Sequence, residues 1–392
     1  MKIRNSKFIF LFIFFTLIYL IGVHFFISST IASRNSSPDS ASLSQTKATD
    51  LERLDTEGKE TDPKKPKQSF NSQNKIFDQN NKDNNQVKTS SPIPNPGQPK
   101  SSAPRSEPYQ PPKPPENINI LFAGDLMFDR YIRLVANRRG PAYIFGNLDR
   151  LFLKQDLVVV NLEGPITANH SLSINTPMNS SDNLIFTFDP SLVQTLQKHN
   201  IKLVNLGNNH ILNFGQAGYE QTKKSLGQGG IFYFGSVNTK KDHKNHIHDF
   251  SGFRIGLINY NQFNKKIAFN YTLDQIKKLR EKVDYLIVYT HWDREYYFTP
   301  LASTRSKAHQ IVDAGADLII GSHSHVIQET EIYQNKTIYY SLGNFIFDQY
   351  FRADTRKGLL VELNIDTQSK NVEQKKYFIR MSPDGQTNLI QS

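Results

Sequence analysis

Short apolar runs alternate with helix-like segments from Asn117 onward, and this alternation constrains the fold more than any other feature. The runs favour buried strands because they are nearly continuous in Val, Ile, Leu and Tyr. The predicted strands cover residues 118–124, 156–163, 184–188, 201–207, 231–235, 253–260, 283–291, 316–322, 337–347 and 358–365, and the predicted helices 190–196, 216–226, 272–282 and 301–314. The pattern predicts a layered α/β domain over residues 117–392, with antiparallel strands near the C-terminus.

The N-terminus carries a different signal. Residues 8–27 have no formal charge at neutral pH, and about 20 apolar residues suffice for one helical bilayer crossing. Lys2, Arg4 and Lys7 precede this run, so the positive-inside rule predicts a cytoplasmic tail at 1–7, a transmembrane anchor at 8–27 and an extracytoplasmic main domain. A cleavable signal peptide ending near Ala32 is the alternative.

Residues 28–116 hold 13 of the 19 prolines and few apolar side chains. Such a segment cannot bury enough apolar surface to offset the entropy of ordering, so we predict a disordered linker. It carries 13 Lys or Arg against 11 Asp or Glu, and residues 1–27 add three basic residues. Of the net charge of +11, a surplus of six is therefore left for residues 117–392, which does not predict nucleic-acid binding.

The chain contains no cysteine. This excludes disulfides, thiolate metal sites, a Cys nucleophile and a lipidated Cys anchor. Any metal must therefore be held by imidazole, amide and carboxylate groups.

Polar side chains of these three kinds follow five of the predicted strands. The carboxyl ends of strands in open α/β sheets form ligand sites, so these side chains are expected to converge. Taken singly, each has a structural alternative, such as a turn residue or a packed core histidine. Together they predict a site for one or two divalent ions, with Mn, Zn or Fe as the candidates. The candidates are Asp125, Glu163, Asn209 with His210, His291, and His323 with His325.

The strings AGDLMFDR, VVNLEGPIT, GNNHILNFG, THWDREY, DLIIGSHSHVIQ and YSLGNFIFD occur in that order over about residues 118–350. In this order they resemble the CapA family of bacterial capsule or poly-γ-glutamate synthesis proteins, within the calcineurin-like metallophosphoesterase superfamily. The resemblance implies a four-layer α-β-β-α sandwich. It also implies metal ligands at Asp125, Glu163 (bridging), Asn209, His291, His323 and His325, with His210 as candidate general acid.

Three positions depart from the superfamily pattern. Met127 replaces a ligand histidine, which weakens the case for a second ion. Asn213 replaces an Asp, and we expect this change to remove a hydrogen-bond acceptor that orients His210 or a ligand. Asp293 replaces a Gly, which requires an unstrained backbone at that position.

Three functions remain open from the sequence. The first is a membrane-tethered, extracytoplasmic role in capsule or poly-γ-glutamate biosynthesis or export, with an anionic surface polymer or other capsule-synthesis subunits as partners. The second is a metal-dependent phosphoester or amide hydrolase in which His210 protonates the leaving group and Arg130 and Asn344 bind the substrate. Arg294 is a weaker candidate for substrate binding, because surface charge also explains it. The third is a non-catalytic module that binds polymer or partner subunits.

Overall fold

The computed structural model describes residues 113–235 and 245–390. The predicted cytoplasmic tail, the predicted transmembrane anchor and residues 28–112 of the predicted linker lie outside the described residues. Within the described ranges, no helix is both long enough and apolar enough to cross a membrane.

The first sheet is mixed. Strands β1–β4 run parallel to one another, and β11 pairs in parallel with β1. On the other side of β1, strands β12, β13 and β14 follow in antiparallel order. Its strands are β1 (Asn117–Leu126), β2 (Leu157–Leu162), β3 (Ile201–Asn205), β4 (Phe232–Phe234), β11 (Asn344–Ile346), β12 (Lys357–Asp366), β13 (Val372–Met381) and β14 (Thr387–Leu389). The prediction of antiparallel strands near the C-terminus is confirmed.

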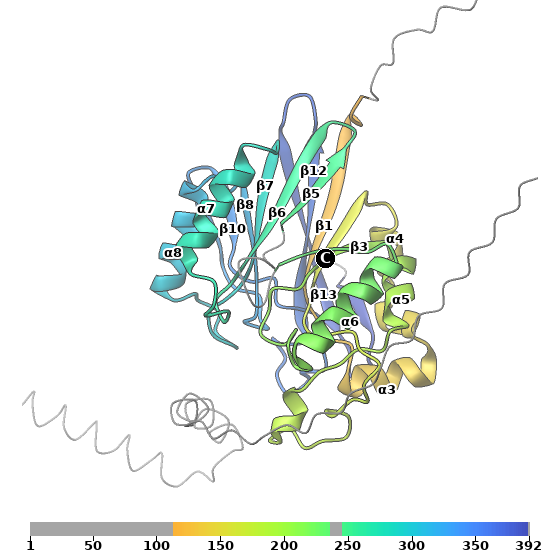
Figure 1. The fold of residues 1–392 in the computed structure, drawn as a ribbon. Helices are drawn as coiled ribbons and strands as arrows, with labels where there is room; N and C mark the ends of the chain where they lie inside the picture. The colour runs from red at the N-terminus through yellow and green to blue at the C-terminus, as the bar shows by residue number, and fades with distance from the viewer. Residues whose placement is uncertain (1–112, 236–244, 391–392) are drawn as a thin grey trace, which may run out of the picture. The chain divides into compact units, whose positions relative to one another are not determined.

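The second sheet has the order β5-β6-β7-β8-β10-β9. Its four inner strands are parallel, and the edge strands β5 and β9 are antiparallel to their neighbours. Its strands are β5 (His246–Phe250), β6 (Phe253–Asn261), β7 (Tyr285–His291), β8 (Leu318–Ser322), β9 (Thr330–Tyr333) and β10 (Lys336–Tyr339). Figure 1 shows the two sheets side by side.

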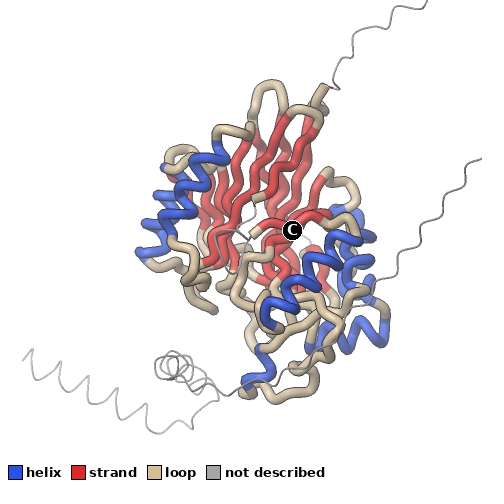
Figure 2. Tube along the Cα trace, in the orientation of Figure 1, coloured by secondary structure: helices blue, strands red, loops and turns tan. Residues whose placement is uncertain are grey.

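Helices cover the outer face of each sheet, as Figure 2 shows in blue. Those on the first sheet are α3 (Arg130–Arg139), α4 (Asp149–Phe152), α5 (Leu192–Lys198) and α6 (Gly215–Gln228), and those on the second are α7 (Phe269–Arg280) and α8 (Ala302–Asp313). Short 3₁₀ turns lie at η1 (Pro141–Phe145) and η2 (Ser181–Leu184).

Three apolar cores hold the layers together. Val160 of β2 faces the helices of the first sheet. Its neighbour Val159 points the other way, into the core between the sheets, where Ile287 of β7 also lies. Val288 of β7 faces α7 and α8. Successive residues of one strand thus enter different cores, which explains why the buried strands read as unbroken apolar runs. Two mixed sheets with helices on their outer faces thus form the layered α/β domain that the sequence predicted.

Four details of the sequence prediction were wrong. Residues 184–188 form only an isolated bridge at Phe188. The predicted strand 337–347 is two strands in different sheets, because the chain crosses between sheets at Gly343, where φ is 70°. Helix α7 begins before Thr272, which is buried inside it rather than capping it. Helices α3 and α4 and the strands β5, β9, β13 and β14 were not predicted, and β13 is largely exposed and rich in charge.

Candidate metal centre

The C-terminal ends of strands from both sheets bring the candidate residues together. Asp125 lies near the end of β1, and Glu163 follows β2 directly. His291 ends β7, and His323 follows β8. The register of β1 against β2 shifts between Phe122 and Asp125, as it does at β-bulges, which often re-aim side chains near functional sites. The convergence predicted from strand ends is what the structure contains.

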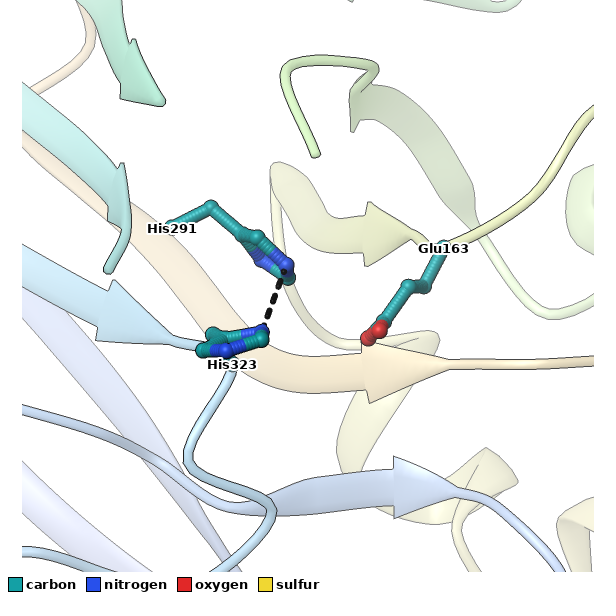
Figure 3. Close-up of side chains that lie close together, drawn as sticks. All are labelled: Glu163, His291 and His323. Carbon is teal, nitrogen blue, oxygen red and sulfur yellow. Dashed lines mark hydrogen bonds between the residues drawn. The ribbon is translucent and has the colours of Figure 1, made fainter. Parts of the chain in front are cut away.

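One set of side chains, the first ligand group, comprises Glu163, Asn209, His291 and His323. The Nε2 atom of His291 lies 2.8 Å from Asn209 Oδ1 and 3.2 Å from His323 Nδ1. Ligand atoms of Glu163, His291 and His323 all lie within 4.8 Å of one another (Figure 3). Asn209 is exposed whereas the other three are buried, so the group is open to solvent on the Asn209 side.

Ser322 determines which nitrogen of the His291 ring carries the proton. Its hydroxyl donates to the Thr290 carbonyl at 2.7 Å, so its oxygen accepts a hydrogen bond from Nδ1–H of His291 at 2.9 Å. In that tautomer Nε2 carries a lone pair directed toward Asn209 Oδ1 and His323 Nδ1. The Asn209 oxygen and this lone pair are both acceptors and face one another at 2.8 Å, which suits a shared cation. Metal-ligating histidines usually donate their other N–H in this manner.

A second ligand group comprises Asp125, Glu163 and His325, whose ligand atoms also lie within 4.8 Å of one another. His325 Nδ1 is 3.5 Å from Asp125 Oδ2, and its Nε2 is 3.8 Å from Glu163 Oε1. Asn344 Oδ1 accepts from His325 Nδ1 at 2.9 Å, which leaves Nε2 free to act as a ligand. Glu163 belongs to both groups.

Glu163 provides the test of whether a cation fits. Its side chain is 0% exposed, and neither carboxylate oxygen has a hydrogen-bond partner among the described residues. Burial, followed by the nearby Asp125 carboxylate, raises the pKa of Glu163 well above its usual value. A buried carboxylate without a partner is strongly unfavourable, and a cation coordinated at this position would remove that cost. The residues present therefore fit a bound divalent ion.

Burial also disfavours the charged forms of the other candidate ligands. It raises the pKa of Asp125, although His325 and the Asn161 amide oppose the shift. It lowers the pKa values of His291 and His323 well below the usual range. Neutral imidazole is the form that ligates metals, so both histidines are in the competent state at pH 7.

His210 lies beside the second group. Its Nε2 is 4.0 Å from Glu163 Oε1, and Phe186 packs against its ring. Burial lowers the pKa of His210 to about 4. Asn213 Oδ1 accepts from His210 Nδ1 at 3.1 Å and from the Phe186 backbone N–H at 2.9 Å. The expectation that Asn213 removes this acceptor was wrong, because an amide oxygen accepts here as a carboxylate would.

The two predicted substrate-binding residues have partners within the protein. The Arg130 guanidinium pairs with Asp348 and donates to Asn183 Oδ1 at 2.9 Å. The Asn344 amide is fully buried and donates to Gln349 Oε1 and to the Thr355 carbonyl. The structure thus makes Asn344 a positioning residue for His325. Arg294, the weaker candidate, is exposed and stacks on the ring of Tyr297.

The other two departures from the superfamily pattern are also visible. Met127 is 0% exposed in the core beneath the helices, and its sulfur accepts from the Asp129 N–H at 3.0 Å. Asp293 has φ of 72°, so the expected unstrained backbone was wrong. Its carboxylate accepts from the N–H groups of Arg294 and Leu301 at 2.9 and 3.0 Å, which holds the turn.

Two of the candidate ligands have a strained backbone. His323 and His325 have φ values of 90° and 56°. Positive φ costs a non-glycine residue about 1–3 kcal/mol and is concentrated at functional sites. The surrounding hydrogen bonds, including one from the His323 N–H to Asp125 Oδ2 at 3.1 Å, hold this conformation.

The sequence prediction missed two supporting residues. Asn161 donates to Asp125 Oδ1 at 2.7 Å and accepts from Asn205 and Asn208. Ser322 positions His291. The available signal was a polar residue inside an otherwise apolar buried strand, which must find hydrogen-bond partners there.

Several known proteins are similar to this chain. The family model "Bacterial capsule synthesis protein PGA_cap" matches residues 119–349, which include both ligand groups. "Capsule biosynthesis protein CapA" of Bacillus anthracis is 29% identical over 281 residues, covering 67% of this chain and 67% of that protein. "PGA biosynthesis protein CapA" of Bacillus subtilis is 27% identical over 263 residues, covering 63% and 68%. A "Probable polyglutamine synthesis accessory protein" of Mycobacterium tuberculosis is 25% identical over 233 residues, covering 51% and 60%. The chain therefore belongs to the bacterial capsule synthesis protein PGA_cap family.

Proposed function

We propose that this protein acts in the biosynthesis or export of capsule or poly-γ-glutamate polymer through a divalent-metal centre formed by the two ligand groups. Family membership and the names of the relatives from Bacillus support the biological role. The observation that carries the metal centre is Glu163, a fully buried carboxylate that both groups share and whose oxygens have no hydrogen-bond partner within the described residues. Imidazole, amide and carboxylate donors suit Mn, Zn or Fe.

The chain's own residues determine what such a centre can do. A bound divalent ion supplies Lewis acidity and lowers the pKa of water. His291 and His323 are neutral and held in place, so they need no proton release to bind it. His210 is neutral at pH 7 in the metal-free protein. It can protonate a leaving group only when a bound anion raises its pKa, because an anion favours the imidazolium form.

The predicted location completes the proposal. Residues 8–27 would anchor the chain in the cell membrane with the N-terminus in the cytoplasm, and residues 28–116 would tether the domain outside. The domain would then meet an anionic surface polymer or other capsule-synthesis subunits. The mild basic surplus of the domain suits such partners better than nucleic acid.

The first experiment is metal analysis of the purified protein after incubation with Mn, Zn or Fe. At least one tightly bound equivalent is expected in the wild type and none in Glu163→Gln. Less than one equivalent in the wild type would overturn the metal centre and leave a non-catalytic binding module. In the native host, deletion of the gene is expected to reduce surface polymer, and unchanged polymer would contradict the biological role.

A metal-dependent hydrolase is the second candidate, favoured by His210, whose Nε2 lies 4.0 Å from Glu163 Oε1. The loaded protein is then expected to cleave a generic phosphoester or an amide, and His323→Ala to abolish the turnover. Metal uptake without turnover of either would leave the polymer role without hydrolysis.

A further inference from the structure

Tyr296 lies beside the second ligand group, and nothing in the sequence analysis assigned it a role. We propose that its hydroxyl group donates a hydrogen bond to an oxyanion bound at the metal centre, which makes Tyr296 a further ligand-binding residue. The inference rests on the proposed metal centre and specifies the chemical class of ligand, a phosphate or carboxylate oxygen.

The backbone fixes Tyr296 next to the ligands. Its N–H donates to the carbonyl of Ser324 at 2.8 Å, and Ser324 stands between His323 and His325 in the sequence. Its φ is 67°, so Tyr296 shares the strained conformation of those two histidines. Its ring centroid lies 6.1 Å from that of His325. Such strain persists only where the surroundings impose it, and here they hold the ring beside the centre.

A directed chain of hydrogen bonds leads from His325 to the hydroxyl group. His325 Nδ1–H donates to Asn344 Oδ1 at 2.9 Å, Asn344 Nδ2 donates to Gln349 Oε1 at 3.1 Å, and Gln349 Nε2 donates to Tyr296 Oη at 3.2 Å. Because Oη accepts from Gln349, its own proton is directed elsewhere. The chain thus positions the O–H group as a donor, coupled to a ligand of the centre.

The phenol stays protonated at neutral pH. Burial, followed by the Glu295 carboxylate, raises the pKa of Tyr296, and Arg130 opposes the shift. The charge of Glu295 raises the pKa of Glu163 as well.

The surroundings favour an anionic rather than a neutral ligand. The Arg352 guanidinium carbon lies 5.5 Å from the centroid of the Tyr296 ring, and Arg130 acts on both the phenol and Glu163. Tyr296 is only partly buried, whereas Asp125 and Glu163 are 0% exposed. Of these three side chains, that of Tyr296 is therefore the one open to solvent.

The test compares Tyr296→Phe with Tyr297→Phe, the same chemical change at the neighbouring exposed tyrosine. Full-length protein loaded with Mn²⁺ is titrated calorimetrically with inorganic phosphate and, separately, with glutarate as a carboxylate probe, and bound Mn²⁺ is measured in every sample. Loss of a hydrogen bond to a charged group is expected to raise the dissociation constant about tenfold in Tyr296→Phe and to leave Tyr297→Phe unchanged. The probe that shows this difference identifies the oxyanion.

The outcomes separate the two proposals. Unchanged binding of both probes in Tyr296→Phe, at normal Mn²⁺ content, would overturn the inference and leave the metal centre standing. Equal weakening in both variants would also overturn it, because the effect would not belong to this hydroxyl group. A wild-type protein that holds no Mn²⁺ would refute the proposed centre itself, and the inference with it. Thermal unfolding of each variant checks that the fold is retained.

Discussion

The two ligand groups share Glu163 but differ in the number of their donor side chains. The first has four donors, with His291 positioned by Ser322 and with the exposed Asn209 on its solvent side. The second has three donors, because the sulfur of Met127 lies in the apolar core and accepts from a backbone N–H. We therefore expect an ion in the first group to bind tightly and a second ion to bind weakly.

Removal of the shared residue should have the largest effect. Glu163→Gln is expected to abolish tight metal binding in both groups, measured as metal equivalents after dialysis. In the metal-free protein the same change should increase the free energy of unfolding at pH 7 by about 1–3 kcal/mol, because a glutamine amide cannot ionise and the cost of burying an ionisable carboxyl group is removed. The gain should grow as the pH rises, since the folded-state pKa of Glu163 is raised and its ionisation opposes folding.

Glu220→Gln is the matched control, because this glutamate is exposed on α6. Glu220→Gln should leave the metal content unchanged and should not raise the stability as Glu163→Gln does. If Glu163→Gln retained a full equivalent of metal, Glu163 would not be a ligand that both groups need.

Single histidine variants test the inequality between the groups. His291→Gln is expected to weaken binding of the tightly held ion by more than the roughly 10–100-fold that loss of an outer hydrogen-bond partner costs. His325→Gln should leave that ion in place and weaken only a second one. His309→Gln, at a surface histidine paired with Glu331, serves as the control. Isothermal titration with Zn²⁺ or Mn²⁺ measures each affinity, and a larger loss in His325→Gln would reverse the comparison.

His210 belongs to neither group, and its titration distinguishes it from the ligands. Its folded-state pKa of about 4 lies below the usual value of about 6.5. The unfolded state therefore binds more protons between these values, so stability is full above pH 6.5 and falls as the pH drops toward 4. The loss attributable to His210 should reach about 3 kcal/mol.

Denaturant unfolding of the metal-free protein at pH 7.5, 6, 5 and 4 measures this loss. His210→Gln should show a shallower decline than the wild type, whereas the contributions of His291 and His323 remain in both. Parallel declines in the two proteins would mean that burial does not keep His210 neutral.

The convergence of the candidate ligands could be predicted from the sequence because strand ends in α/β folds converge whatever the details of the helices. Asp125, Glu163, His291 and His323 each follow a strongly apolar run, which is the clearest signal a sequence gives. The role of Asn344 could not be predicted. It lies where the chain leaves one sheet for the other, so its hydrogen bond to His325 depends on a crossing that an unbroken apolar pattern concealed.

The missed elements have a similar physical explanation. Strand β13 is mostly exposed and charged, so its pairing with β12 leaves no apolar alternation to detect. Asp293 and Tyr296 adopt positive φ through contacts with Leu301 and Ser324, which are tertiary and invisible to local rules. Sequence reasoning thus fails mainly where distant contacts impose local strain.

Restoration of the missing imidazole is the mildest test of the comparison. Met127→His places a histidine two residues after Asp125, the spacing at which the superfamily pattern has a ligand. It should tighten binding of the second ion by about tenfold, or about 1.4 kcal/mol, and leave the first ion unchanged. Without metal it should lower the free energy of unfolding by about 1 kcal/mol, because the Asp129 N–H loses its sulfur acceptor.

Met178→His is the control for Met127→His, since Met178 is 72% exposed. Metal-dependent stabilisation is the sharper readout, because an ion that binds only the folded state raises stability in proportion to its affinity. If Met127→His lost stability without metal and regained none with it, the imidazole would be held in the apolar core as the thioether is. Metal binding in the second group would then be limited by the direction in which β1 points the side chain at position 127, and not by the identity of that side chain.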